Sequence, residues 1–448
     1  MRLLNGLLAG AAMITLSLAT AAPAAEHVGR FATPPGQVVA IKAGQLYEPA
    51  SGKFVANQVI LIRGDRIADV GPNLAIPAGA KVIDLSTSNV MPGMIDSHVH
   101  VTVSGETPAE RAIWSVASVQ ADLDAGFTTI KDMDSRGGFA TVDLREMINQ
   151  GIVQGPRMQV VGQSLNNRNM RYVPDTNSGK FYSGRTEGKD INGPWLARAA
   201  VREAKNHGVD YIKIYSTEDY VADTHLWLPD GSFQVFDSLT AEEVTAVVDE
   251  AHRLGLKVAC HSYDGTAKDP CLVGGVDEPN HLLQLDADGV AMIKKTHSIY
   301  VPTVDDLIGL EKEDNEATHG RNSRIAMLSA AVKRAHAAGI EMAFGSGATA
   351  PPWGDIPHGK QANQFKWFVD QGLSPAEALR LSYIGSAHTL NYHMETMIGT
   401  IEKGKYADII AVAGDPLKDV TEMERVKFVM KGGRIVRDDL ARSAVPSR

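Results

Sequence analysis

Residues 240–262, TAEEVTAVVDEAHRLGLKVACHS, carry the pattern that decides the fold. Thr240 and Glu243 have the spacing of a capping box, and apolar residues follow at helical spacing until Gly255 ends the helix. The stretch from Lys257 to Ser262 then alternates as a β-strand does. The segment therefore predicts one helix followed by one strand.

The same alternation of strand and helix continues on both sides of this segment. Ser374 and Glu377 repeat the capping box. Eight alternating units between residues 91 and 394 favour a (β/α)8 TIM barrel over an open doubly wound sheet, and no GxGxxG or GxxxxGK[ST] loop indicates a nucleotide. The predicted strands are 93–101, 127–133, 157–162, 210–216, 257–262, 278–283, 299–304 and 341–348.

Both ends of the chain have the sequence pattern of short strands joined by turns. Residues 59–62 and 66–70 flank a Gly64-Asp65 turn, and residues 407–412, 426–430 and 435–436 repeat the pattern near the other end. We predict a β-sandwich module built from residues 26–90 and 395–448, beside a barrel of residues 91–394.

Residues 1–25 are predicted to be a secretory signal peptide. Arg2 precedes an apolar run over residues 3–18, and Ala22-Pro23-Ala24 is a small-x-small cleavage pattern. The alternative is a membrane anchor, but the run is shorter than the ~20 residues that cross a bilayer. We therefore expect an exported protein, periplasmic or secreted, that leaves the membrane after cleavage. Two cysteines do not make a disulfide scaffold, and the sequence leaves the pairing of Cys260 and Cys271 open.

The composition of the 448 residues narrows the class of protein. With 53 acidic and 44 basic side chains the net charge is −9, while 44% of residues are apolar and 22% are charged. This composition is typical of a soluble globular protein. The acidic balance gives no reason to expect nucleic acid as a partner. We leave a homo-oligomer open.

Candidate site residues lie near the carboxyl ends of the predicted strands, where barrel enzymes carry their chemistry. His98 and His100 are two residues apart on one strand, so both face the same side and suit one metal ion. Lys213 lies among apolar neighbours, where it needs either a buried carboxylate partner or conversion to a carbamate. His261 points inward if Cys260 faces the helices, and His281 follows on the next strand; buried structural histidines are the alternative.

Five segments resemble the amidohydrolase superfamily, in its exported imidazolonepropionase-like and prolidase-like branch. They are MPGMIDSHVH at 91–100, GFTTIKD at 126–132, YIKI at 211–214, GTIEKGKYADI at 399–409 and VMKGG at 429–433. The resemblance implies a TIM barrel with two divalent metal ions, usually Zn²⁺. His98 and His100 would hold one ion, His261 and His281 the other, and a carbamylated Lys213 would bridge them.

The same resemblance implies hydrolysis of an amide bond by a metal-activated hydroxide. We expect a small-molecule amide or dipeptide as substrate, with dipeptides and N-acyl amino acids, including ochratoxin-like mycotoxins, as the candidates. A lactonase or phosphotriesterase on the same centre, and a catalytically inactive binding protein, are the alternatives.

The sequence departs from the family pattern on the eighth strand, where residues 343–350 read AFGSGATA. Gly347 stands where the family has an aspartate that binds metal and carries a proton to the leaving amine, so we expect impaired catalysis. Three explanations compete: an inactivating substitution, a natural non-hydrolytic relative, or replacement of the role by Asp355 or His358. We favour the first.

A second departure follows the third strand, where related sequences often carry a Gly-Gly-His loop and residues 164–170 read SLNNRNM. Arg168, Tyr220 and His225 are candidates to bind a substrate carboxylate. The alternative for each is a solvated loop side chain.

Overall fold

The computed structural model describes residues 29–34, 36–102, 105, 107–135, 137–166, 173–174, 181–182, 189–217, 227–304, 319–350 and 357–440. The predicted signal peptide, Arg168, Tyr220, His225 and Asp355 lie outside these ranges. Within them, no helix has the length and apolar character needed to cross a membrane.

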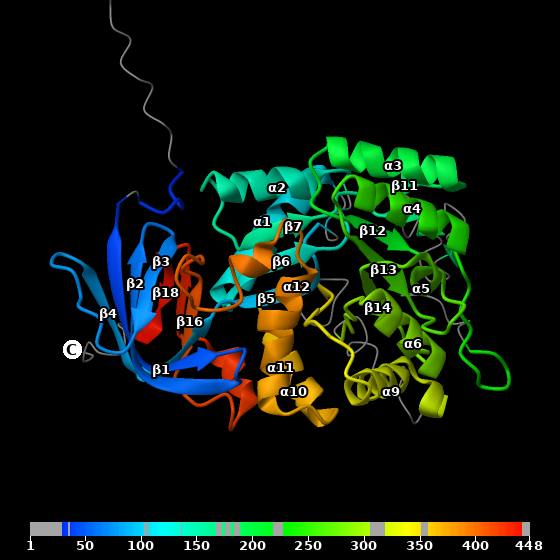
Figure 1. Ribbon diagram of the computed structural model, residues 1–448. Coiled ribbons are helices and arrows are strands. Elements are labelled where there is room, and N and C mark those ends of the chain that lie inside the picture. The colour runs from blue at the N-terminus through cyan, green and yellow to red at the C-terminus, as the bar shows by residue number, and fades with distance from the viewer. Residues whose placement is uncertain are drawn as a thin grey trace, which may run out of the picture.

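Both ends of the chain contribute to one seven-stranded sheet, seen on the left of Figure 1. The first two strands pair antiparallel, β4 lies parallel to β1, and β16 from the far end of the chain adds antiparallel to β4. The sheet order is β18-β17-β16-β4-β1-β2-β3, with β1 at Val38–Glu48, β2 at Lys53–Arg63, β3 at Arg66–Gly71, β4 at Lys81–Pro92, β16 at Ile409–Val412, β17 at Phe428–Lys431 and β18 at Arg434–Asp438.

Between these ends, parallel strands alternate with helices, which confirms the predicted α/β class. The strands pair in the orders β15-β5-β6-β7 and β11-β8-β12-β13-β14. Their bounds are β5 Met94–His100, β6 Phe127–Asp132, β7 Arg157–Val160, β8 Leu165–Asn166, β11 Lys189–Asp190, β12 Ile212–Tyr215, β13 Val258–Ser262, β14 Glu278–His281 and β15 Ala348–Thr349. A separate antiparallel pair joins β9, Val173–Pro174, to β10, Phe181–Tyr182.

Two predicted strands do not form continuous ladders. Residues 299–304 and 341–348 make the isolated parallel bridges Asn280–Val301, Tyr300–Met342 and Thr303–Gly345. Pro302 has no N–H to donate to a ladder, which explains the interruption in the first range. The bridges place residues 299–304 beside β14 and residues 341–348 beside residues 299–304. At the end of the second range, β15 pairs with β5.

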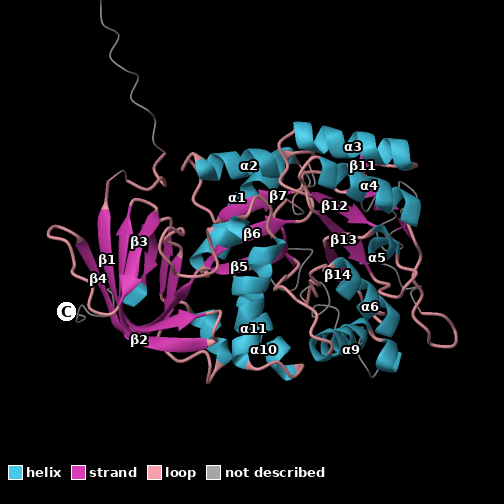
Figure 2. Cartoon of the chain, in the orientation of Figure 1, coloured by secondary structure: helices cyan, strands magenta, loops and turns pink. Residues whose placement is uncertain are grey.

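The helices lie outside the strands, as Figure 2 shows. The capping boxes predicted at Thr240 and Ser374 are both present. The helices are α1 Pro108–Asp124, α2 Ala140–Asn149, α3 Pro194–Asn206, α4 Ala241–Arg253, α5 Pro270–Gly274, α6 Ala287–Thr296, α9 Arg324–Ala337, α10 Gln364–Asp370, α11 Pro375–Arg380 and α12 Ser386–Thr389. Short helical turns occur at Gly320–Asn322, Gln361–Asn363, Leu381–Gly385, Met394–Thr396 and Val420–Arg425.

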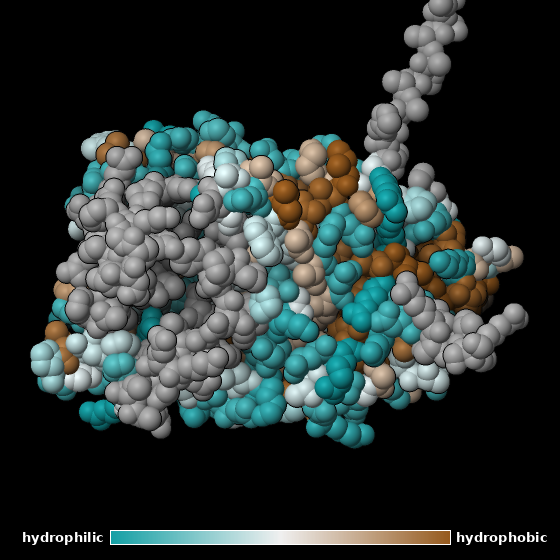
Figure 3. All heavy atoms as spheres, turned by 180° about the vertical axis from the view of Figure 1, so that it is seen from behind, coloured by the Kyte–Doolittle hydropathy of each residue, from teal (hydrophilic) through white to brown (hydrophobic). Residues whose placement is uncertain are grey.

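The apolar core fills the space between strands and helices. Phe127, Phe344 and Phe365 are fully buried, and the rings of Phe344 and Phe365 lie 4.7 Å apart. Figure 3 shows mostly polar surface with hydrophobic patches toward the side from which the N-terminal trace departs. In barrel enzymes the active-site residues lie at the carboxyl ends of the strands, beyond such a core.

Helices α3 and α4 are joined by an ion-pair network around Glu250. Arg202 from α3 lies 2.7 Å from Glu250, and Arg253 of α4 also pairs with it. The hydrogen bonds from Arg202 and Arg253 lower the pKa of Glu250 to about 2. Because the folded pKa is below the unfolded one, the network stabilises the fold above pH ~4.5 and its contribution is lost as the pH falls through about 2.

We expect Glu250→Gln to lower the free energy of unfolding by about 1 kcal/mol at pH 7, since the two paired arginines are half-exposed. The difference from the parent should narrow as the pH falls from 4.5 toward 2. Urea unfolding at several pH values measures both effects. Glu242→Gln, an exposed position on the same helix, is the control, and an equal loss of stability in both variants would contradict the assignment.

Candidate metal centre

Strand β5 places the first two predicted ligands together. His98 and His100 lie near its carboxyl end, both are buried, and their ring centroids are 5.1 Å apart. The spacing of two residues in a strand puts both side chains on one face. The predicted histidine pair therefore converges on one place.

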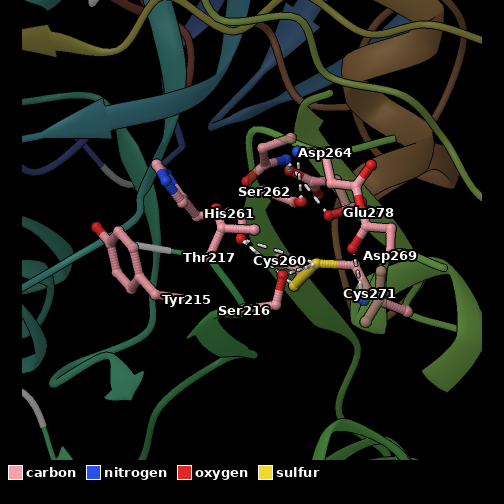
Figure 4. Close-up of a disulfide and its surroundings, with 12 residues drawn as sticks. Tyr215, Ser216, Thr217, Cys260, His261, Ser262, Asp264, Asp269, Cys271 and Glu278 are labelled. Atoms are coloured by element: carbon pink, nitrogen blue, oxygen red, sulfur yellow. Dashed lines mark hydrogen bonds between the residues drawn. A yellow bond between two sulfur atoms is a disulfide. The ribbon is translucent and has the colours of Figure 1, made fainter. Parts of the chain in front are cut away.

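Strand β13 supplies the third histidine. Cys260 forms a disulfide with Cys271 of α5, so its side chain faces the helices, which answers the question that the sequence left open. Strand alternation then turns His261 the other way, and Figure 4 shows His261 and Tyr215 on the side away from the disulfide. The ring of His261 lies between Tyr215 at 4.8 Å and Tyr263 at 4.6 Å, measured between centroids.

His281 ends β14 in an unusual backbone conformation. Its φ is +68°, in the left-handed region that residues other than glycine rarely adopt. The hydroxyl of Thr303 contacts its Nδ1, and Tyr300 donates a hydrogen bond of 2.6 Å to its carbonyl oxygen. The ring lies 4.5 Å from that of His261 and 5.4 Å from that of His98. This turn brings His281 to the other histidines.

Lys213 lies on β12 and is buried, with only 1% of its surface exposed. Its Nζ donates a hydrogen bond of 2.8 Å to Oδ1 of Asn280 and lies 5.3 Å from the ring centroid of Tyr215. The sequence predicts either a buried carboxylate partner or a carbamate for this lysine, and the hydrogen bond seen here is to an amide.

The four histidines and Lys213 form one cluster. Burial, followed by the charges of Lys213 and the other three histidines, holds the pKa of His98 well below its usual value. His98 is therefore neutral, which is the form that binds metals, and its buried Nδ1 has no hydrogen-bond partner among the described residues. Within the same residues, no three His, Cys, Asp or Glu side chains are arranged to hold a metal ion. The side chains that could donate to a metal here are the four histidines and Lys213.

Gly347, where the sequence resemblance predicts an aspartate, lies next to this cluster. Its N–H donates a hydrogen bond of 2.6 Å to the carbonyl oxygen of His98, so its backbone lies against β5. Its φ is +79°, a conformation that favours glycine. An aspartate here would adopt a strained backbone unless the chain moved.

Asp96 is a buried carboxylate near Gly347 that the sequence analysis did not select. Its Oδ1 accepts hydrogen bonds of 3.0 Å from the backbone N–H groups of His98 and Ser346. Burial raises its pKa to about 7. These bonds tie β5 to the segment that carries Gly347.

His358, a candidate to replace the missing aspartate, is hydrogen-bonded through both nitrogens of its ring. Its Nδ1 donates to Asp122 of α1 at 2.8 Å, and its Nε2 donates to the carbonyl oxygen of His100 at 3.3 Å. Burial lowers the pKa of His358, but the charge and hydrogen bond of Asp122 outweigh this effect and raise it. His358 thus links α1 to the end of β5.

A cavity of about 590 Å³ lies at the other end of the strands, lined by Gly255, Lys257, Leu390 and Asn391 among others. Lys257 immediately precedes β13, whereas His261 lies near its carboxyl end. The cavity is therefore separate from the histidine cluster.

Comparisons with known proteins identify the family of this chain. The model of the amidohydrolase family matches residues 89–436. The chain belongs to the amidohydrolase family. This amidohydrolase is 24% identical to ochratoxinase of Aspergillus niger over 445 residues, which cover 90% of the chain and 88% of ochratoxinase. The relatives are hydrolytic enzymes, so hydrolysis is the class of reaction that the comparisons support.

Solved structures share the fold of this amidohydrolase. A Xaa-Pro dipeptidase with methionine bound in its active site aligns with a TM-score of 0.75 and 27% identity, covering 90% of this chain and 100% of that one. The structure of ochratoxinase from Aspergillus niger aligns with a TM-score of 0.74 and 21% identity, covering 90% and 96%. The family predicted from the sequence is therefore confirmed.

Proposed function

We propose that this chain is a metal-dependent amidohydrolase that cleaves the amide bond of a dipeptide or N-acyl amino acid, including ochratoxin-like amides. The observation that carries the proposal is the cluster of four buried histidines around Lys213. The relatives named ochratoxinase and Xaa-Pro dipeptidase support this substrate class. The proposal includes closure of the parallel strands into a (β/α)8 barrel beside the seven-stranded sheet of the chain ends.

The donor set fits two divalent ions, because imidazole suits zinc and His98 is neutral. His98 and His100 would hold one ion, His261 and His281 the other, and a carbamylated Lys213 would bridge them. When bound, the ions supply Lewis-acid activation of water and of the scissile carbonyl. Thr303 fixes the ring of His281 at Nδ1, which is the kind of support that orients a metal-binding histidine.

The missing side chain at residue 347 limits the reaction. Departure of the amine requires a proton, and a positioned acid or base typically contributes about 10²–10⁴-fold to the rate. Gly347 offers no such group. We therefore infer that amide hydrolysis by this chain is slow compared with a chain that carries aspartate there.

The test is a substrate panel with the zinc-loaded protein. We expect slow release of the amino acid from an N-acyl phenylalanine, from a Xaa-Pro dipeptide or from an ochratoxin-like amide. Removal of the metal with a chelator should abolish that activity, and added zinc should restore it. Mass spectrometry of the products measures the release.

The same panel separates the alternatives. If the protein cleaves a lactone or a phosphotriester but none of the amides, it is a lactonase or a phosphotriesterase and the proposal is wrong. The missing side chain at residue 347 favours one further candidate, a catalytically inactive binding protein. Such a protein would bind an N-acyl amino acid in calorimetry but would not hydrolyse it, even after Gly347→Asp.

A further inference from the structure

A chain of buried polar side chains leads from Lys213 into the interior. Lys213 donates to Oδ1 of Asn280, and Nδ2 of Asn280 donates to Oε1 of Glu278 at 3.3 Å. The other oxygen of Glu278 pairs with Nζ of Lys131 on β6. Nζ of Lys131 also lies 3.4 Å from the carbonyl oxygen of Thr389. All four side chains of the network, Lys131, Glu278, Asn280 and Lys213, are buried.

This network fixes which way the amide of Asn280 points. A carboxylate accepts hydrogen bonds only, so Glu278 requires the NH₂ end of the amide on its side. The oxygen of Asn280 must then face Lys213. Lys131 neutralises Glu278, because a buried carboxylate needs a paired charge. Asn280 is thus held as an acceptor for Nζ of Lys213.

We propose that Asn280 is a positioning residue that selects and orients the carbamate of Lys213, an inference that rests on the proposed function. In carbamylation the neutral Nζ attacks carbon dioxide, an N–C bond forms, one C=O electron pair moves to oxygen, and Nζ releases a proton to solvent. The carbamate nitrogen keeps one N–H. That N–H would donate to Oδ1 of Asn280 and so fix the plane of the carbamate. The two carbamate oxygens would then remain available to bind the ions.

The test uses the full chain loaded with zinc in ¹³C-labelled bicarbonate. Asn280→Leu removes the acceptor at nearly the same volume. We expect loss of the ¹³C carbamate resonance and binding of the second zinc that is tenfold or more weaker, the range typical of groups that support metal ligands. Asn89→Leu is the control, because Asn89 donates to the carbonyl oxygen of Gly414 in the chain-end sheet and should leave both readouts unchanged.

A second variant does not depend on Asn280→Leu folding. Asn280→Asp places two carboxylates together and should lose the carbamate. The carboxylate would pair with the ammonium form of Lys213 and repel the anionic carbamate.

The outcomes separate the two proposals. If the parent chain shows two zinc ions and a carbamate while Asn280→Leu or Asn280→Asp keeps both in full, the role of Asn280 is wrong and the proposed function stands. If the parent itself shows neither, the proposed function fails and takes this inference with it.

Discussion

Gly347→Asp is expected to raise the rate of amide hydrolysis by about 10²-fold or more, the usual contribution of a positioned acid or base. The new carboxylate would lie beside β5, because the N–H of residue 347 donates to the carbonyl oxygen of His98. The gain should appear in kcat with an N-acyl phenylalanine as substrate. It should also appear with zinc present and vanish with a chelator.

The backbone at residue 347 sets the control for this experiment. With φ at +79°, any side chain costs about 1–2 kcal/mol of strain, and aspartate is among the residues that tolerate it best. Gly347→Ala introduces the same strain without a carboxylate, so it should remain as slow as the parent. Equal rates for the aspartate and alanine variants, with zinc bound to both, would contradict the role assigned to residue 347.

Lys213→Met is expected to reduce bound zinc from two ions to at most one and to lower kcat by about 100-fold or more in the Gly347→Asp background. The change removes the proposed bridging group while keeping an apolar side chain of similar length, so no unpaired charge is left buried. Losing metal activation costs several kcal/mol of transition-state stabilisation, and each 1.36 kcal/mol is about tenfold in rate. Elemental analysis and kinetics on the same sample measure both effects.

Lys257→Met is the matched control for that variant. Lys257 donates to the carbonyl oxygens of His388 and Leu390, both at 2.8 Å, at the opposite end of β13 from His261. It should keep two zinc ions and full activity. Retention of both ions in Lys213→Met would show that the lysine is not a bridging group.

Periodicity and caps predicted most of the fold because they are local signals. The capping box at Thr240 and the alternation before His261 depend on residues close in sequence, and both elements form as expected. Residues 299–304 form only isolated bridges, and Pro302 supplies one backbone donor fewer there. The pairing of β16 with β4 joins strands that are far apart in sequence. The local pattern at each end of the chain therefore predicted the strands but not which strand pairs with which.

The sequence also selected the histidines and Lys213, but not what holds them. Strand alternation would send Asn280 and His281 to opposite faces, yet the positive φ of His281 turns its ring toward the cluster. A backbone angle of that kind comes from tertiary contacts such as those of Tyr300 and Thr303, so no local pattern reveals it. The pairing of His358 with Asp122 is hidden for the same reason, because 236 positions separate the two residues.

The metal content of the unmodified chain tests the central claim most directly. Elemental analysis after loading with zinc and removal of free metal should give two ions per chain, and His98→Ala should give at most one. No retained zinc in the folded parent chain would contradict the assignment of the cluster as a metal centre and leave only the family and its fold.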